Sequence, residues 1–158
     1  MDELRISTGS KEEKYESLYK QIVSVVEFEA DAIANMANVA SMIHETFGFL
    51  WTGFYRVTED EQLVLGPFQG SLACTRIKKG RGVCGTAWDE NQTLLVPDVE
   101  QFPGHIACSS LSKSEIVVPL RDDNGMVKAV LDIDSKDLAT FDETDQKWLE
   151  LICGVIKV

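Results

Sequence analysis

The sequence predicts an α+β domain, in which a mostly antiparallel sheet carries the terminal helices on one face and an irregular segment on the other. Two stretches, 49–67 and 114–134, alternate apolar and polar residues on both sides of a turn, as the strands of a hairpin do. Helical patterns lie before the first hairpin and after the second. Hairpins of neighbouring strands combined with terminal helices are typical of an α+β fold. We expect the irregular middle of the chain to arch over the free face of the sheet and to enclose a pocket there.

The first two elements are helices. Ser10 and Glu13 form the pattern of a capping box, and apolar residues recur at helical spacing over 15–26. A second helical pattern covers 31–47 and carries His44 on its apolar stripe. A histidine in such a place is more often a hydrogen-bonded packing residue than a ligand, and we interpret it so.

The other elements follow from turn and capping signals. The Asn124-Gly125 pair is a strong signal for a hairpin. Thr140 and Glu143 form a second capping box, and Cys153 lies off the apolar stripe of the helix that follows and receives no role. The remaining predicted elements are strands over 49–57, 62–67, 73–78, 93–96, 114–121 and 126–134, a short helix from Gly82 to Asn91, a long functional connection over 98–113, and a final helical stripe of Trp148, Leu151, Ile152, Val155 and Ile156.

The composition restricts the domain count and the partners. With 158 residues, 44% hydrophobic and 26% charged, the chain suits one domain, and we expect a flexible arm over 1–9 and a single domain over 10–158. A net charge of −11 argues against nucleic acid and anionic membranes as partners. The polar N-terminus does not resemble a signal peptide, and no apolar run approaches the roughly 18 residues of a membrane span. We therefore expect a cytoplasmic protein.

Three of the four cysteines lie in one segment and suggest redox chemistry. Cys84 follows three basic residues and opens the predicted short helix, whereas Cys108 follows His105 by three residues in the long connection. Both contexts favour a reactive thiolate, and two such thiols can form a sulfenic acid and then a disulfide. Two alternatives stay open: a zinc site of Cys74, Cys84, Cys108 and His105, which lacks the short C-x2-C pairing, and simple packing of all three thiols.

A group of carboxylates marks the predicted pocket. Asp132 and Asp134 share one face of an otherwise apolar strand, and Glu115 begins the neighbouring strand. Crowded carboxylates can keep one proton near neutral pH, so one can act as a general acid while others bind an ammonium group. Trp51 and Tyr55 share a face of another strand and would wall the same pocket. The alternative is that the strand with the two aspartates has one solvated face.

Seven motifs together resemble the free methionine-R-sulfoxide reductases, which are single GAF-domain enzymes. They are Trp51-Thr-Gly-Phe-Tyr55, Leu65-Gly-Pro-Phe-Gln-Gly70, Gly82-Val-Cys-Gly-Thr-Ala87, Val96-Pro-Asp-Val99, His105-Ile-Ala-Cys108, Ser114-Glu-Ile-Val117 and Leu131-Asp-Ile-Asp-Ser135. The resemblance implies that free L-methionine R-sulfoxide is the substrate and that Cys108 is the attacking thiolate. It implies that Glu115, Asp132 and Asp134 contact the substrate, and that Trp51 and Tyr55 hold its S-methyl group.

The resemblance also implies how the enzyme is recycled. Cys108 becomes a sulfenic acid, a second cysteine closes a disulfide, and thioredoxin reduces that disulfide without a metal or organic cofactor. We favour Cys84 as the disulfide partner and Cys74 as a relay. A homodimer through the terminal helices is expected by analogy with other GAF domains. The competing interpretations are a GAF domain that senses a small ligand without turnover and a redox sensor whose disulfide changes its partner.

Overall fold

The computed structural model describes residues 3–6, 8–106 and 108–158. Its elements confirm the predicted order of two helices, a hairpin, an irregular middle, a second hairpin and a last helix. The helices are α1 (Lys11–Val26), α2 (Ala32–Phe47), α3 (Gly82–Glu90), the 3-10 turn η1 (Val99–Gln101) and α4 (Glu143–Gly154). The strands are β1 (Trp51–Val57), β2 (Gln62–Gln69), β3 (Arg76–Lys78), β4 (Leu94–Val96), β5 (Ser114–Arg121) and β6 (Val127–Ser135).

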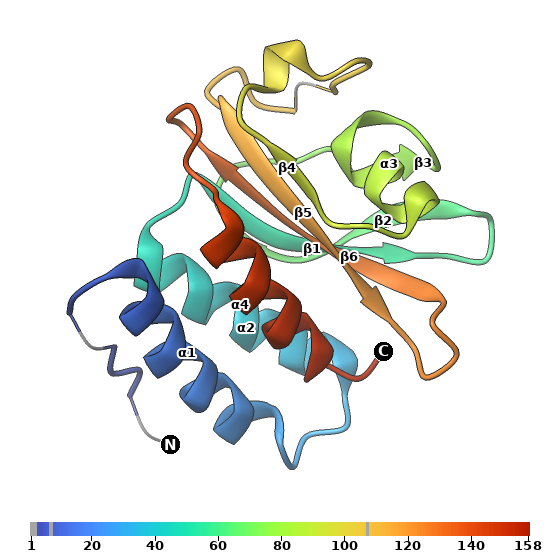
Figure 1. Ribbon diagram of the computed structural model, residues 1–158. Helices are drawn as coiled ribbons and strands as arrows, with labels where there is room; N and C mark the ends of the chain where they lie inside the picture. The colour runs from blue at the N-terminus through green and yellow to red at the C-terminus, as the bar shows by residue number, and fades with distance from the viewer. Residues whose placement is uncertain (1–2, 7, 107) are drawn as a thin grey trace.

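One antiparallel sheet of six strands separates two layers. Its order is β3-β2-β1-β6-β5-β4, so each hairpin pairs neighbours and β1 joins β6 across the centre. Figure 1 shows α1, α2 and α4 together on one face, while α3 and the loop after β4 lie on the other. The predicted α+β architecture, with helices on one face and an arch on the other, is confirmed.

The helix-side layer holds the larger apolar core. Tyr15, Ile43, Phe54 and Leu131 are fully buried in it, together with apolar residues of α4. His44 lies at the sheet side of α2, where its Nδ1 atom is 3.2 Å from Thr52 Oγ1. His44 is therefore a hydrogen-bonded packing residue, as predicted.

Side-chain caps fix where the first two helices begin. The Ser10 side chain accepts from the Glu13 amide, and the Asp31 side chain accepts from the Ala34 amide. Each cap satisfies an amide that has no partner inside its helix. Gly48 ends α2 with a φ of 65°, a left-handed conformation that costs glycine little.

The prediction for α4 was wrong in two details. Asp142, not Thr140, caps the helix, and Asp142 exchanges bonds with Asp145 in a capping box. The buried stripe is Leu149, Ile152, Cys153 and Ile156, whereas Leu151 is 43% exposed. Both candidate stripes share Ile152 and Ile156 and differ by one position around the helix, so periodicity alone could not choose between them. Cys153 is thus a core residue.

Residues 3–6 lie along α1. The Arg5 amide donates to Gln21 Oε1 at 2.7 Å, and Leu4 and Ile6 pack partly buried against the helix-side core. A flexible arm and a domain that begins at residue 10 stay predictions. Within the described ranges, no helix is both long and apolar enough to cross a membrane.

Candidate active site

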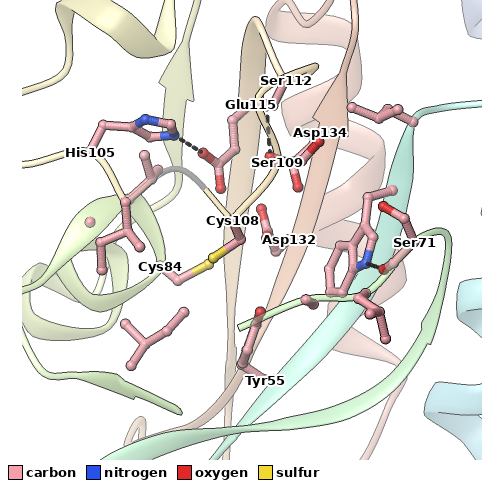
Figure 2. A pocket seen from close by; sticks show the side chains of 18 of the residues that line it. Tyr55, Ser71, Cys84, His105, Cys108, Ser109, Ser112, Glu115, Asp132 and Asp134 are labelled. Carbon is pink, nitrogen blue, oxygen red and sulfur yellow. Dashed lines mark hydrogen bonds and ion pairs between the residues drawn. The ribbon is translucent and has the colours of Figure 1, made fainter. Parts of the chain in front are cut away.

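The open face of the sheet carries a cavity of about 50 Å³. Strands β1, β5 and β6 form its floor, α3 forms one wall, and the loop after β4 covers it (Figure 2). Seven of the eight residues predicted for the site line it: Trp51, Tyr55, Cys84, Cys108, Glu115, Asp132 and Asp134. The eighth, Cys74, is bonded to Cys108. The fold therefore brings the predicted site residues together.

Two aromatic side chains of β1 form one wall and hold the next segment. The rings of Trp51 and Tyr55 are 5.9 Å apart, as expected for residues on one face of a strand. Trp51 Nε1 donates to the Ser71 carbonyl at 3.1 Å, and the Tyr55 hydroxyl donates to the Cys74 carbonyl at 2.9 Å. The wall thus also fixes the backbone that carries Cys74.

Gly53 lies between the two aromatic residues of β1. A Cβ atom there would lie 2.4 Å from Phe68 Cβ and 2.5 Å from the Trp51 ring. Only glycine leaves room for this ring to lie over the strand.

Three carboxyl groups lie together on the cavity floor. Asp134 pairs with Glu115 across β6 and β5, and Asp132 lies two residues farther along β6 on the same face. Asp132 is only 6% exposed and Glu115 only 5%. The alternative of a solvated strand face is therefore wrong.

Burial determines the proton affinity of this group. It is the largest cause that raises the pKa of Glu115 and of Asp134 well above their ordinary values, and the charge of Asp132 raises both further. Burial also raises the pKa of Asp132, but hydrogen bonds donated by Glu115, Cys84 and Asp134 oppose that rise. Burial and the neighbouring charge therefore favour the protonated form of Glu115 and Asp134 over that of a solvated carboxyl group. Asp132 Oδ1 has no hydrogen-bond partner among the described residues.

Two side chains that the sequence did not assign to the carboxyl group contact it. His105 Nε2 is 3.8 Å from Glu115 Oε1, and burial lowers the pKa of this imidazole. Ser112 Oγ donates to Asp134 Oδ1 at 3.3 Å. Both residues lie in the loop after β4. The sequence of this loop has no periodic pattern from which its path could be predicted. The sequence placed His105 only beside Cys108 and gave no signal for Ser112.

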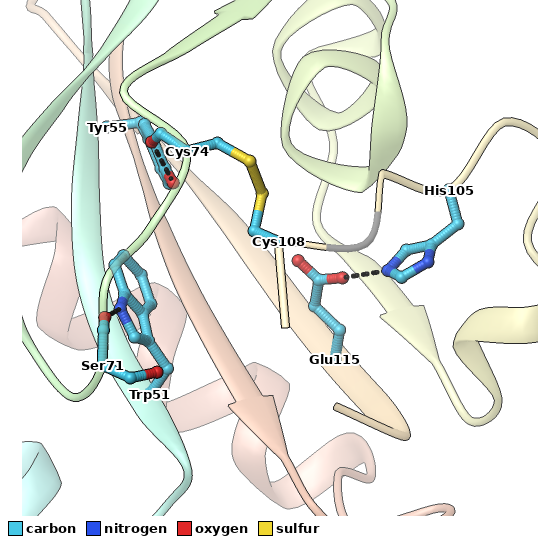
Figure 3. The surroundings of a disulfide bond; sticks show 7 residues. All are labelled: Trp51, Tyr55, Ser71, Cys74, His105, Cys108 and Glu115. Atoms are coloured by element: carbon cyan, nitrogen blue, oxygen red, sulfur yellow. Dashed lines mark hydrogen bonds and ion pairs between the residues drawn. A yellow bond between two sulfur atoms is a disulfide. The ribbon is translucent and has the colours of Figure 1, made fainter. Parts of the chain in front are cut away.

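A disulfide joins Cys74 to Cys108 at the cavity, with Cα atoms 5.7 Å apart (Figure 3). The expectation that Cys84 is the partner of Cys108 was wrong for this structure, in which Cys84 is a free, buried thiol. The zinc alternative is also wrong here, because the disulfide consumes two of its proposed ligands. Simple packing of all three thiols is excluded by the same bond.

The surroundings of Cys84 explain why local sequence misled. It does lie in the first turn of α3, as predicted, but Lys78, Lys79 and Arg81 are exposed. Burial and the charge of Asp132 raise the pKa of the Cys84 thiol well above its ordinary value. Cys84 is therefore a poor thiolate in this state.

One group of described side chains offers the donor atoms for a metal ion. Cys84, Glu115 and Asp132 place one sulfur and two oxygens within 4.8 Å of one another. The same atoms form the hydrogen-bonded floor of the cavity, so a metal would compete with the protons that these groups hold.

Comparison with known proteins identifies the family. A profile of the GAF domain matches residues 30–158. The solved structure of free methionine-R-sulfoxide reductase from Neisseria meningitidis, in complex with its substrate, is similar to this chain with a TM-score of 0.96 and 51% identity, over 99% of this chain and 94% of that one. The chain belongs to the GAF-domain family of free methionine-R-sulfoxide reductases. The resemblance read from the seven motifs is confirmed.

Curated proteins similar to this chain come from both eukaryotes and bacteria. GAF domain-containing protein A of Dictyostelium discoideum is 58% identical over 155 residues, which cover 98% of each chain. The free methionine-R-sulfoxide reductase of Escherichia coli is 43% identical over 151 residues, which cover 94% of this chain and 90% of that protein. The similarity thus spans nearly the whole chain in both cases.

Proposed function

We propose that this protein reduces free methionine R-sulfoxide to methionine with Cys108 as nucleophile and Cys74 as the cysteine that resolves the intermediate. The observation that carries the proposal is the Cys74–Cys108 disulfide beside a cavity floored by three carboxyl groups. Relatives named for this activity, one of them solved with its substrate, support the choice of reaction.

The cavity offers complementary groups for each part of the substrate. The S-methyl group fits the aromatic wall of Trp51 and Tyr55, where sulfur and methyl contacts with rings are favourable. The ammonium group suits Asp132, whose Oδ1 atom lacks a donor among the described residues. The sulfoxide oxygen suits Glu115 or Asp134, because burial raises the pKa of each and so favours the protonated form, which can donate.

The first chemical step transfers oxygen from substrate to enzyme. The Cys108 thiolate attacks the sulfoxide sulfur while Glu115 or Asp134 protonates the oxygen. The attack forms a bond between the two sulfur atoms, the sulfur–oxygen bond of the substrate breaks, and the protonated oxygen leaves as hydroxide. Hydroxide then attacks the Cys108 sulfur, which breaks the sulfur–sulfur bond, releases methionine and leaves Cys108 as a sulfenic acid. Methionine leaves with its sulfur reduced by two electrons, which the Cys108 sulfur has lost.

The second step forms the disulfide that the structure contains. The Cys74 thiol attacks the sulfur of the Cys108 sulfenic acid, a sulfur–sulfur bond forms, and the hydroxyl leaves as water. Tyr55 supports this step by holding the Cys74 carbonyl at 2.9 Å, which keeps that segment beside Cys108. No metal or organic cofactor enters either step.

Recycling requires a dithiol. We assign this role to thioredoxin, which would return two electrons and two protons by thiol–disulfide exchange and become a disulfide itself. The cytoplasm suits this cycle, because its thiol systems keep cysteines such as Cys84 and Cys153 reduced.

We also propose a homodimer. Phe28, between α1 and α2, is 92% exposed, with the partly exposed Val25 and Ile33 beside it in sequence. These side chains supply an apolar surface for a second copy. Sedimentation equilibrium of wild type and Phe28→Glu tests this, and a monomeric wild type would contradict it.

The activity is tested by thioredoxin-coupled NADPH consumption. The substrates are free methionine R-sulfoxide, the free S epimer and a peptide-bound sulfoxide, and the variants are Cys108→Ser and Cys84→Ser. We expect turnover of the free R form alone, its loss in Cys108→Ser, and retention in Cys84→Ser. Freshly reduced protein that turns over none of the three sulfoxides would favour a GAF sensor instead.

A further inference from the structure

The two segments that carry the redox cysteines lack charge. No Asp, Glu, Lys or Arg occurs over 62–75 or over 101–112, in a chain that is 26% charged with a net charge of −11. His105 is the one titratable group of the two runs apart from the cysteines, and it is turned toward Glu115 rather than solvent. The two segments that carry the cysteines thus contribute no carboxylate to the surface around the disulfide, where the exposed Arg81 also lines the cavity.

Around the disulfide, the described residues include an exposed cysteine and large exposed apolar side chains. Cys108 is exposed and Cys74 half-buried. Leu72, two residues before Cys74, is 91% exposed, and Leu111, three residues after Cys108, is 64% exposed. An extended chain spans at most about 3.6 Å per residue, so the Cα atom of each leucine lies within roughly 11 Å of the Cα atom of its cysteine.

We propose that this neutral rim, defined as residues 71–75 and 108–112, is the docking surface of a dithiol protein reductant of the thioredoxin class. The inference rests on the proposed function, since it concerns the recycling step. Cores of protein interfaces are depleted of charged residues, and a few large side chains supply most of the binding energy. Leu72 and Leu111 are the large apolar side chains of this rim.

The exposure of the two cysteines determines which sulfur the reductant attacks first. A reductant thiolate attacks the sulfur of Cys108, the more exposed of the two residues, the Cys74–Cys108 bond breaks, and Cys74 leaves as a thiolate that takes a proton. In the mixed disulfide, the first sulfur of the reductant is bonded to Cys108. The second thiol of the reductant attacks that first sulfur and releases Cys108 as a thiolate. The protein gains two electrons, and the reductant leaves as a disulfide.

Neutrality of the rim also fits the charge of the rest of the molecule. A surface with a net charge of −11 slows the approach of any acidic partner. A rim without carboxylates removes close like-charge contacts at the point where the sulfurs must meet. A small-molecule dithiol needs no such surface, and this difference provides the test.

The experiment compares two reductants on protein that is already oxidised and contains no substrate. The variants are Leu111→Glu, Leu72→Glu and a matched control, Met126→Glu. Met126 is also apolar and 61% exposed, but it lies in the turn between β5 and β6, whereas Cys108 lies before the start of β5. The rate of loss of the Cys74–Cys108 disulfide is measured with thioredoxin and with dithiothreitol.

We expect each leucine variant to lower the second-order rate with thioredoxin by about 10-fold, since every 1.4 kcal/mol is a factor of ten. The dithiothreitol rate and both rates of Met126→Glu should match wild type. Equal losses with both reductants, or no loss with thioredoxin, would overturn the docking surface while leaving the reductase reaction intact. If thioredoxin fails to reduce even wild type, both the recycling step and its docking surface are wrong.

Discussion

The two faces of the sheet bury acidic groups in opposite ways. On the helix side, Asp145 is 1% exposed and accepts from the Tyr15 hydroxyl and from Lys11 Nζ, both at 2.6 Å, and from the Asp142 amide at 2.9 Å. On the cavity side, no lysine or arginine among the described residues pairs with the carboxyl group of Asp132 and its neighbours. Asp145 accepts hydrogen bonds at both of its oxygens, whereas the cavity carboxyl groups lie beside one another, and burial raises the pKa of each.

This difference separates an acid that supports the fold from acids that serve a ligand. Asp145 ties α1 to the first turn of α4, so its partners come from the protein itself. Asp132 retains a free oxygen on the floor of a cavity, and a buried acceptor without a donor costs about 1–3 kcal/mol. Such a cost is expected where a substrate supplies the missing partner.

The largest expected effect is on activity. Of Glu115→Gln and Asp134→Asn, the one that removes the general acid should lower kcat/KM by about 10²-fold or more, because the sulfoxide oxygen then lacks a proton donor. The exposed Asp123→Asn serves as control. The assay is single-turnover formation of methionine, and full activity in both variants would contradict the assigned role.

The second effect is on stability. Asp145→Ala should lower the free energy of unfolding by about 2–4 kcal/mol, because it leaves the buried Tyr15 hydroxyl without its acceptor and removes the nearer of the two carboxylates that pair with Lys11. The lower end of that range allows for Lys11, whose side chain is 34% exposed and can be hydrated. Urea unfolding of wild type and Asp145→Ala measures this change in the free energy of unfolding.

A matched surface pair provides the control for Asp145. Lys147 and Glu12 also join α4 to α1, at 2.8 Å, but in solvent. Lys147→Ala should lower the free energy of unfolding far less than Asp145→Ala, because solvent screens this pair. If both variants lost the same free energy of unfolding, burial of Asp145 would not explain its contribution to stability.

The smallest effect is on the pH dependence of stability. The pKa values of Glu115 and Asp134 are higher in the folded state, so their contribution is fully present below the unfolded values of about 4 and is lost as the pH rises through the folded values. Wild type should therefore lose stability relative to Glu115→Gln/Asp134→Asn as the pH rises above about 4. Each unit of pKa shift corresponds to about 1.4 kcal/mol. Unfolding curves at several pH values test this, and parallel pH profiles would contradict it.

Local signals predicted the fold and the floor of the site. The Ser10 cap and the Asn124-Gly125 turn depend on neighbouring residues alone, and both appear as predicted. Asp132 and Asp134 stood out because period two placed two acids in an apolar strand. Such features depend on the spacing of residues along the chain, so they could be predicted without a structure.

Features that depend on distant contacts could not be predicted. The basic residues before Cys84 indicated a reactive thiol, but they are exposed while the thiol is buried beside carboxyl groups. The choice of Cys74 as partner depends on how the segment after β2 meets the loop after β4. The contact between Ser112 and Asp134 depends on the same loop.

The most direct test of the account is to map the thiols after one turnover. Fully reduced protein is mixed with an equal amount of free methionine R-sulfoxide without any reductant, denatured in an alkylating agent and digested for mass spectrometry. We predict one methionine per chain, a Cys74–Cys108 disulfide, and alkylated Cys84 and Cys153. A disulfide between Cys84 and Cys108, or methionine formed with all four cysteines alkylated, would contradict the proposed roles of Cys108 and Cys74.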